Sequence, residues 1–306
     1  MKKALLIINV TSGKALLSKR LADLIEFFMQ CGYEIRVHII NPEKGLTLKQ
    51  LKKEEVKEYD LVVLGGGDGT LNSFINYLME IDERPVIGYL PSGSTNDFAK
   101  SIGIPADLNK ACNVIRKGEL FTYDIGSFND KYFNYVAAFG AFAEVSFATD
   151  QNMKNAIGYA AYVLNAIKDI PQSIGYSKHL HIETDTKTIE GDYVFGAVSN
   201  SVSVGGLKLY GNTPVGLDDG KLELLLIKTP QVVTDFSYIL NAISTGDLNN
   251  EFVSLIQIKY ANISSEEEIT WSIDGEFGGK CRETKIGIVE KAITIKSGLK
   301  AVRKNN

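Results

Sequence analysis

Three short segments of this sequence combine glycine, hydroxyl and carboxylate residues in patterns that suit phosphate chemistry. The first, residues 65–70, reads GGGDGT, and the second, residues 91–97, reads PSGSTND. The third is Asp274-Gly275-Glu276, in which one glycine separates two carboxylates. Glycine-rich turns let backbone N–H groups bind phosphate, whereas carboxylates bind metal ions or accept protons.

The glycine-rich turn at residues 65–70 is the strongest of these signals. It lies between a predicted buried strand and a predicted helix, whose N-terminus would favour negative charge. Asp68 would by itself repel phosphate, so it is best explained as a ligand of a Mg²⁺ ion that also binds the phosphates. A plain strand–helix turn with a capping aspartate is the alternative. Six such residues at a strand end favour the phosphate site, although the spacing matches neither a Walker A motif nor G-x-G-x-x-G.

The other two segments are weaker signals when each is taken alone. Residues 91–97 follow the next predicted strand and would face the same crevice as the first turn. They are equally explained as an ordinary helix N-cap formed by Thr95 or Asn96, and their place beside the first turn is what favours a nucleotide site. Asp274-Gly275-Glu276 is a common turn sequence, so alone it favours a structural role.

The elements that must position these segments change in kind near residue 123. Before it, apolar runs and helical spacing alternate, which predicts a parallel sheet with helices on both faces. After it, short strands separated by Asn, Gly and Asp turns predict an antiparallel β domain. Expected strands are 4–10, 33–40, 60–64 and 86–90, then 179–186, 189–198, 222–228, 252–259, 268–273, 285–290 and 292–296. Expected helices are 18–31, 47–59, 70–81, 97–102 and 107–117, then 156–170 and 230–243.

We therefore expect two domains joined without a flexible linker. An α/β nucleotide-binding domain with a Rossmann-like parallel sheet would span residues 1–125, and an antiparallel β-sandwich domain would span residues 126–290. The tail, residues 291–306, could pack back on the first domain. Because ligands often bind between domains, we expect a cleft with the phosphate cradle on one side and a carboxylate of the β-rich domain on the other.

Composition and charge exclude several classes of protein. The 306 residues carry 33 Lys+Arg and 37 Asp+Glu, a net charge of −4, which offers no overall field for nucleic acid. The three cysteines are odd in number and far apart, which argues against a disulfide framework and fits a reducing cytoplasm. Since no apolar stretch approaches the roughly 20 residues needed to span a bilayer, contact with a membrane would be peripheral, at its surface.

The three segments, together with others along nearly the whole chain, carry a family resemblance. The sequence resembles the bacterial soluble diacylglycerol kinases, relatives of the sphingosine kinases and, more distantly, of the NAD kinases. The matching segments are residues 9–14, 65–72, 91–97, 124–126, 157–164, 204–206, 214–224 and 274–276. GGDGT alone is shared with NAD kinases, but the ordered set is specific to lipid kinases. The resemblance implies an NAD kinase-like fold and transfer of the ATP γ-phosphate to a lipid hydroxyl, with diacylglycerol as the acceptor and phosphatidic acid as the product.

The resemblance also implies which residues bind ATP. They are Asn9, Val10, Thr11, Ser12, Gly13, Lys14, Asn41, Gly66, Gly67, Asp68, Gly69, Thr70, Leu71, Asn72, Ser73, Gly93, Thr95 and Asn96. Three positions differ from the family pattern: Val10 replaces the proline of N-P-x-S-G, Ser73 replaces a glutamate, and Asn41 replaces a threonine at the edge of the adenine pocket. The turn after Asn134 also lacks the aspartate often found there. These differences bear on substrate identity more than on phosphoryl transfer.

Catalytic and metal-binding roles follow from the same resemblance. Asp274 would be the general base that takes the proton of the lipid hydroxyl, supported by Asp124 and Glu276. One Mg²⁺ ion would accompany ATP at Asp68, and a second, structural Mg²⁺ ion would lie in the loop of residues 216–221. The ligands of that second ion would be the Asp219 carboxylate and the backbone carbonyls of Gly216 and Lys221.

Three further features favour a structural role over a functional one. His179 and His181 share one face of a predicted strand and could begin a metal site, but the sequence offers no third ligand. The apolar helix at 156–170 could line an acyl-chain pocket or simply fill the core. Lysines 49, 52, 53 and 57 could contact anionic lipid, but the glutamates interleaved with them favour a solvated helix face.

We therefore expect an ATP- and Mg²⁺-dependent lipid kinase in the cytoplasm, peripheral to the inner face of the membrane. Its partners would be ATP and a lipid, not nucleic acid, and a homodimer is one arrangement open to it. The alternatives are a kinase of another hydroxylated lipid or small amphiphile, and a nucleotide-binding regulator with weak catalysis. Asp68 and Asp274 argue against the regulator, whereas Ser73 argues mildly for it.

Overall fold

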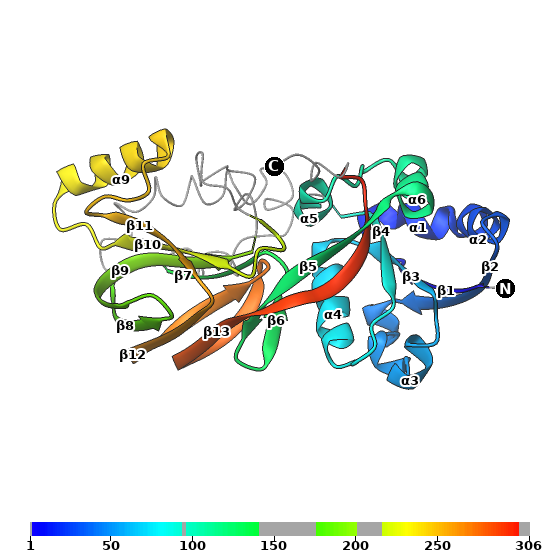
Figure 1. The fold of residues 1–306 in the computed structure, drawn as a ribbon, viewed down its shortest axis with the longest axis horizontal. Helices are drawn as coiled ribbons and strands as arrows, with labels where there is room; N and C mark the ends of the chain where they lie inside the picture. The colour runs from blue at the N-terminus through cyan, green and yellow to red at the C-terminus, as the bar shows by residue number, and fades with distance from the viewer. Residues whose placement is uncertain (1, 94–95, 141–175, 201–215, 300–306) are drawn as a thin grey trace. The chain divides into compact units, whose positions relative to one another are not determined.

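The structure, a computed structural model, describes residues 2–93, 96–140, 176–200 and 216–299. The chain divides into two compact units (Figure 1). The first unit is Met1–Tyr123 with Lys291–Asn306, and the second is Asp124–Glu290. The helix predicted at 156–170 and the resemblance segments at 157–164 and 204–206 lie outside the described residues.

The strands of the first unit run parallel to one another. They are β1 (Lys2–Asn9), β2 (Tyr33–Ile40), β3 (Leu61–Gly66) and β4 (Val86–Pro91), in the order β4-β3-β1-β2. In β1 the side chains from Ala4 to Ile8 are at most 1% exposed. A strand with helices on both faces of its sheet is apolar at every position, which explains this unbroken run. The carboxyl ends of β1, β3 and β4 meet at one edge of the sheet, where the polar segments follow.

Helices and short 3₁₀ turns cover both faces of this sheet (Figure 1). A Cβ atom on Gly65 would lie 2.6 Å from Leu17, and one on Gly88 would lie 2.8 Å from Ile115. Helices α1 and α6 therefore pack against the same face, and glycine permits their close approach. The helical elements are η1 (Gly13–Ala15), α1 (Leu16–Lys19), α2 (Leu21–Gln30), η2 (Pro42–Lys44), η3 (Leu48–Gln50), α3 (Lys53–Val56), α4 (Asp68–Met79), α5 (Asp97–Ser101) and α6 (Leu108–Lys117).

Two helices predicted in the first unit are interrupted in the structure. The predicted helix at 18–31 is two helices, because Arg20 (φ −109°, ψ 12°) leaves helical geometry between them. The predicted helix at 47–59 is reduced to η3 and α3. Thr47 and Gln50 cap η3 reciprocally, and Leu51 then becomes extended (ψ 131°) and buries its side chain. Leu51 after η3 and Val56 in α3 are both buried, and in the sequence this resembles the apolar face of one long helix.

The end of the long strand β13 (Glu276–Ser297) belongs to the first unit. Ile295 pairs in parallel with Ile87 of β4. The Ser297 hydroxyl donates a hydrogen bond to the carbonyl oxygen of Ile102 at 2.9 Å. These contacts hold the described part of the C-terminal segment on the first unit.

The second unit is built from antiparallel strands around a buried tryptophan. Its strands follow the order β11-β10-β9-β7-β12-β13, and β8 pairs with both β9 and β12. Trp271 is fully buried, and the rings of Phe128 and Phe139 pack edge-on against it with centroids 5.1 and 4.9 Å away. The elements are β5 (Glu119–Phe128), which enters from the first unit, β6 (Lys131–Phe133), β7 (Val136–Gly140), β8 (Lys178–Thr184), β9 (Thr188–Ser199), β10 (Leu222–Lys228), α9 (Val233–Thr245), β11 (Val253–Ile258), β12 (Tyr260–Ile273) and β13.

Several strands of the second unit differ from the predicted pattern. The strand predicted at 268–273 is the end of the 14-residue β12, and the strands predicted at 285–290 and 292–296 are one continuous β13. Lys291 between them is a left-handed residue (φ 50°) inside the strand, where the sequence suggested a turn. Strands β5, β6 and β7 were not predicted. Only a few residues separate them, so turn residues do not mark their limits clearly in the sequence.

Candidate functional site

Loops after three parallel strands of the first unit converge on one another. The side-chain amide of Asn9, at the end of β1, donates to the Thr70 hydroxyl at 2.8 Å. The backbone N–H of Ser92, after β4, donates to the carbonyl oxygen of Gly66 at 2.9 Å. The hydroxyls of Ser12 and Ser92 are also hydrogen-bonded to each other. The structure therefore brings together the segments 9–14, 65–70 and 91–93 that the sequence singled out.

Glycine is required where these loops touch. A Cβ atom on Gly13, whose φ is +56°, would lie 1.8 Å from the carbonyl oxygen of Ser92. A Cβ atom on Gly93 would lie 2.8 Å from the Cα atom of Gly67. Glycine lets these backbones pack closely with no side chain between them, as in the glycine-rich turns that bind phosphate.

Helix α4 begins in the middle of this cradle. Its first residue is Asp68, and no side chain of the N-cap residue Gly67 satisfies the first N–H groups. The N-terminus of a helix carries partial positive charge and favours an anion. The Ser73 hydroxyl donates to the carbonyl oxygen of Gly69 at 3.0 Å, one turn earlier in the helix. The start of α4 can therefore hold an anion, and the Asp68 carboxylate lies beside it.

A buried tyrosine is hydrogen-bonded to the glycine turn at residues 65–70. Tyr89 of β4 is fully buried, and its hydroxyl donates to the carbonyl oxygen of Gly66 at 3.2 Å. Burial, and then the charge of Asp68, raise the pKa of Tyr89 well above its ordinary value. The hydroxyl therefore keeps its proton and its hydrogen bond across the physiological pH range. The sequence analysis missed Tyr89. The only hint in the sequence was a single tyrosine within an apolar strand.

Three further residues expected to bind ATP differ in their surroundings. Asn41 follows β2 at the same edge, where its side-chain Oδ1 is buried and has no hydrogen-bond partner within the described ranges. Asn96 closes the second turn, accepting from the Gly93 N–H at 2.9 Å and donating to the Gly93 carbonyl at 2.6 Å. Thr95 lies outside the described residues, as does Ser94.

Asp274, in the second unit, is held by the backbone of one neighbouring segment. Its carboxylate accepts hydrogen bonds from the N–H groups of Asn134 (2.7 Å), Tyr135 (3.1 Å) and Val136 (3.0 Å). The side chain is 5% exposed and the residue is left-handed, with φ 48°. Backbone N–H donors stabilise the ionised carboxylate and direct its lone pairs toward the protein. This geometry suits a residue that fixes the turn between β12 and β13.

The other two carboxylates expected to act in catalysis have contrasting surroundings. Asp124 is 1% exposed, and its Oδ2 accepts a hydrogen bond from the Gly220 N–H at 2.8 Å. Asp124 is therefore tied to the loop at residues 216–221. Glu276 is the first residue of β13 and its side chain is exposed. Of the three carboxylates, Glu276 is the one that the described structure presents to solvent.

The loop expected to bind a structural metal ion folds back on itself. Asp219 Oδ1 accepts from the Lys221 N–H at 3.1 Å, and a Cβ atom on Gly216 would lie 3.2 Å from Asp219 Oδ2. Next to the loop, Glu223 of β10 is fully buried, and burial raises the pKa of its carboxyl to about 8. The sequence analysis missed Glu223, although a single acidic residue in the apolar run LELLLI was a visible signal.

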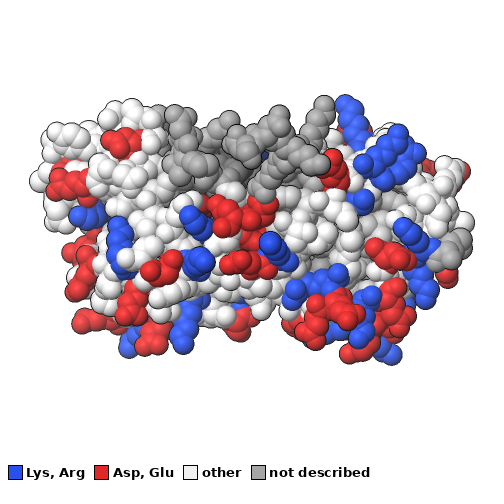
Figure 2. Space-filling view, viewed as in Figure 1, with Lys and Arg blue, Asp and Glu red and all other residues white. Residues whose placement is uncertain are grey.

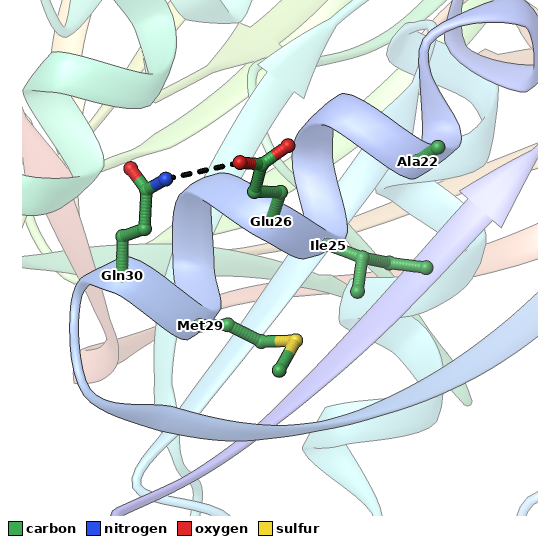
Figure 3. A pocket seen from close by; sticks show the side chains of 5 residues that line it. All are labelled: Ala22, Ile25, Glu26, Met29 and Gln30. Atoms are coloured by element: carbon green, nitrogen blue, oxygen red, sulfur yellow. Dashed lines mark hydrogen bonds between the residues drawn. The ribbon is translucent and has the colours of Figure 1, made fainter.

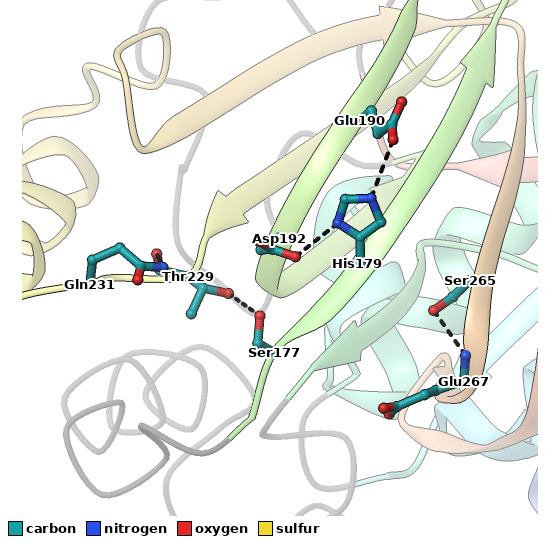
Figure 4. A network of polar contacts seen from close by, with 8 residues as sticks. All are labelled: Ser177, His179, Glu190, Asp192, Thr229, Gln231, Ser265 and Glu267. Carbon is teal, nitrogen blue, oxygen red and sulfur yellow. Dashed lines mark hydrogen bonds and ion pairs between the residues drawn. The ribbon is translucent and has the colours of Figure 1, made fainter.

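His179 and His181 lie on the exposed face of β8, opposite two acids of β9. The strand register pairs His179 with Asp192 and His181 with Glu190. His179 Nδ1 and Asp192 Oδ1 are 2.9 Å apart, and His179 Nε2 and Glu190 Oε1 are 3.3 Å apart (Figure 4). Within the described ranges, no three His, Cys, Asp or Glu side chains are arranged to hold a metal ion. The geometry therefore favours surface ion pairs.

These contacts give a prediction for the titration of His179. Its pKa is raised, first by the hydrogen bond to Asp192 and then by the one to Glu190. The resulting stabilisation is present below the ordinary pKa of histidine and is lost as pH rises through the raised value. Replacing Asp192 with Asn should lower the His179 pKa, as measured by NMR titration, and Glu190→Gln should lower it less. An unchanged His179 titration in Asp192→Asn would contradict the pairing.

Comparisons with known proteins identify the family of this chain. The diacylglycerol kinase catalytic domain model matches residues 3–128. The chain is 31% identical over 280 residues to the diacylglycerol kinase of Bacillus subtilis (strain 168), covering 91% of both chains. It is also 31% identical over 281 residues to that of Staphylococcus carnosus (strain TM300), covering 91% of this chain and 90% of the relative. The chain belongs to the diacylglycerol kinase family.

Solved structures of this family share the fold. A diacylglycerol kinase from Bacillus anthracis str. Sterne superposes with a TM-score of 0.74 at 22% identity, covering 97% of each chain. A second crystal structure from the same organism superposes with a TM-score of 0.82 at 24% identity, covering 97% of this chain and 95% of the other. Family membership identifies the chain as a kinase with an NAD kinase-like fold.

Proposed function

We propose that this member of the diacylglycerol kinase family transfers the γ-phosphate of ATP to the hydroxyl of diacylglycerol, forming phosphatidic acid. The observation that carries the proposal is the convergence of the loops after β1, β3 and β4 at the N-terminus of α4. Phosphoryl transfer depends on positioning and on electrostatic stabilisation of the phosphates. A cradle of glycine backbone at a helix N-terminus supplies both.

The first unit is the proposed nucleotide-binding domain, Rossmann-like in its parallel sheet. Segments 9–14 and 66–73, with Gly93, Thr95 and Asn96, would surround the phosphates of ATP. Asn41 would contact the nucleotide from the end of β2, and its buried Oδ1, which has no hydrogen-bond partner among the described residues, supports that role. The second unit, for which we propose a β-sandwich arrangement of its antiparallel strands, would supply the lipid site and the proton acceptor.

Within the second unit we assign different roles to the three carboxylates. A general base must present a lone pair to the proton that it abstracts. Asp274 directs its carboxylate at three backbone N–H groups, whereas Glu276 on the same turn is exposed. Glu276 is therefore the better candidate for the proton acceptor, with Asp274 positioning its turn and Asp124 bracing the loop at 216–221. The resemblance alone had placed the base at Asp274.

The donor sets of two sites fit Mg²⁺, which prefers oxygen ligands. Asp68 supplies a carboxylate at the start of α4, within the phosphate cradle. At the second site, Gly216 lies beside the Asp219 carboxylate, and the carbonyls of Gly216 and Lys221 would join that carboxylate as ligands. Bound at the nucleotide, Mg²⁺ would neutralise phosphate charge during transfer. An ion at residues 216–221 would instead make the loop more rigid. Asp124 is hydrogen-bonded to this loop through Gly220.

We propose that the enzyme is cytoplasmic and meets its lipid at the inner surface of the membrane. No helix of the described ranges is long and apolar enough to cross a bilayer. On the face shown in Figure 2, basic and acidic side chains are interspersed, so that face carries no field of one sign to attract anionic lipid. Docking would therefore be local and weak, through apolar and basic residues, and would depend on salt.

An acceptor assay tests the proposed reaction. The protein is incubated with labelled ATP, Mg²⁺ and mixed micelles containing diacylglycerol, a monoacylglycerol or a sphingoid alcohol, and in parallel with a water-soluble diol. We expect diacylglycerol to be the preferred acceptor. Preference for another amphiphile would reassign the substrate, and equal use of the soluble diol would contradict a lipid kinase. ATP binding without transfer to any acceptor would indicate a nucleotide-binding regulator.

A further inference from the structure

Tyr135 is fixed beside the turn of the second unit that carries Asp274 and Glu276. Its backbone N–H donates to Asp274 Oδ1 at 3.1 Å, and its carbonyl oxygen accepts from the Asn200 N–H at 3.0 Å. Both hydrogen-bonding groups of its backbone are therefore paired. The residue lies directly before β7, and its side chain leaves the backbone from a well-defined position.

The hydroxyl of Tyr135 lies close to the glycine that separates the two carboxylates. A Cβ atom on Gly275, whose φ is +85°, would lie 3.8 Å from the Tyr135 hydroxyl oxygen. Within the described ranges, and apart from the residues on either side of Gly275, no other atom lies within 4 Å of that position. Because residue 275 is glycine, it places no side chain between the hydroxyl and the turn. A phenol hydroxyl can donate a hydrogen bond, which a carboxylate cannot.

The ring of Tyr135 has apolar surroundings. It is half-buried and packs against a buried cluster on one face of the antiparallel sheet, which we call the α9 cluster. Among others, the α9 cluster contains Val136 of β7, Ala197 of β9, Leu225 of β10 and Ile239 of α9. Tyrosine has an apolar body and a polar tip, so it suits a boundary between apolar and polar surroundings. Tyr135 therefore marks the place where the apolar cluster meets the carboxylate turn.

A glycerolipid acceptor has its own groups in the same order. In diacylglycerol the acyl chains end in ester carbonyls, and one ester is carried by the carbon next to the one that bears the free hydroxyl. When that hydroxyl lies at the proposed proton acceptor, Glu276, the neighbouring ester lies on the side of the turn where Tyr135 is found. An ester carbonyl that leaves water without a new donor loses hydrogen bonds. The Tyr135 hydroxyl can replace one of them.

We propose that the Tyr135 hydroxyl donates a hydrogen bond to an ester carbonyl of the acceptor, and so makes the enzyme selective for acylated glycerol over other long-chain alcohols. The assignment rests on the proposed function, because it requires a lipid hydroxyl at the turn of residues 274–276. The ester does not react, so its hydrogen bond is equally strong before and during phosphoryl transfer. Such a contact lowers KM without raising kcat. A hydrogen bond from Tyr135 that orients Glu276 would instead affect every acceptor alike.

An apolar surface of the first unit offers a contrast. Helix α2 carries a hollow lined by Ala22, Ile25, Glu26, Met29 and Gln30 (Figure 3). Its two polar side chains pair with each other, since Gln30 Nε2 donates to Glu26 Oε1 at 3.2 Å. Met29 is 60% exposed, which is unusual for so large an apolar side chain. A substitution of Met29 therefore controls for effects of exposed apolar surface alone.

Two acceptors that differ only in their carbonyl groups test the assignment. They are dioleoylglycerol and its diether analogue, di-O-oleylglycerol, each presented in mixed micelles with ATP and Mg²⁺. The wild type should show a kcat/KM about five- to tenfold higher for the diester, the usual contribution of one neutral hydrogen bond. Tyr135→Phe removes only the hydroxyl oxygen. It should raise KM for the diester until the preference is lost, and leave kcat and the use of the diether unchanged.

Two control variants separate this contact from packing. Tyr176→Phe removes the hydroxyl of another ring that packs against the α9 cluster. Tyr176 precedes β8, which pairs with β9 at Tyr193, about 20 Å along that strand from Ser199 at the end next to Tyr135. Met29→Gln changes the hollow on α2. Both controls should keep the preference for the diester, and Tyr135→Phe should unfold at the same temperature as the wild type.

The possible outcomes distinguish the assignment from the proposed function. Equal use of diester and diether by the wild type, or an unchanged preference in Tyr135→Phe, would overturn the assignment and leave a lipid kinase in place. A fall in kcat of equal size on both acceptors would also overturn it, because Tyr135 would then orient the proton acceptor. If the wild type phosphorylated neither lipid, the proposed function would fail, and the assignment with it.

Discussion

Replacing Glu276 with Gln is expected to reduce turnover by about 10²–10⁴-fold, the usual cost of losing a general base. The amide keeps the shape of the side chain but cannot accept the proton of the lipid hydroxyl. Because Glu276 is exposed and begins β13, its replacement should leave the melting temperature and the affinity for ATP nearly unchanged. The matched control is Glu283→Gln, another exposed glutamate on the same strand, which should retain full activity.

Asp274→Asn provides the contrasting result. The amide would turn at least one N–H group toward the backbone donors of residues 134–136, which now bind the carboxylate. Losing a hydrogen bond to a charged, buried group costs about 1–3 kcal/mol, so activity and stability should fall together. If Asp274→Asn abolished turnover at unchanged stability while Glu276→Gln stayed active, the base would be Asp274, as the family resemblance implies.

This contrast shows where sequence information stops. The motif Asp274-Gly275-Glu276 locates a turn with two carboxylates, but a motif does not say which one is buried. The answer depends on residues 134–136, which are about 140 positions away and reach Asp274 through the pairing of β7 with β12. Non-local backbone contacts of this kind have no signature at the residue that they hold.

Local structure was more predictable than the limits of the elements. The strands expected at 33–40 and 222–228 have those limits in the structure, because the alternating residues of the first and the apolar run of the second are each bounded by turn residues. Helix α2 begins later than predicted, since nothing in the sequence marks the break at Arg20. Likewise, the convergence of loops followed from the order of parallel strands, but the contact of Gly13 with Ser92 could not be derived from either segment alone.

The close contact of Gly13 with Ser92 leads to the second prediction with a large expected effect. Gly13→Ala should displace the loop at residues 9–14 from Ser92, because the added Cβ would lie 1.8 Å from the Ser92 carbonyl oxygen. The left-handed backbone, with φ +56°, adds a cost of roughly 1–2 kcal/mol for a residue with a Cβ. If the loop binds ATP as proposed, its displacement should weaken ATP binding by at least about tenfold, which corresponds to about 1.4 kcal/mol.

Gly45→Ala isolates the collision from the backbone strain. Gly45 is also left-handed, with φ +70°, and an added Cβ there would have nothing within 4 Å. Both variants should therefore lose a similar amount of stability from the strained φ, but only Gly13→Ala should lose ATP affinity as well. Calorimetric titration with ATP and Mg²⁺, alongside thermal unfolding, measures the two effects separately. Equal ATP affinities for the two variants would mean that the loop at residues 9–14 does not bind the nucleotide, and the cradle would then consist of the turns after β3 and β4 alone.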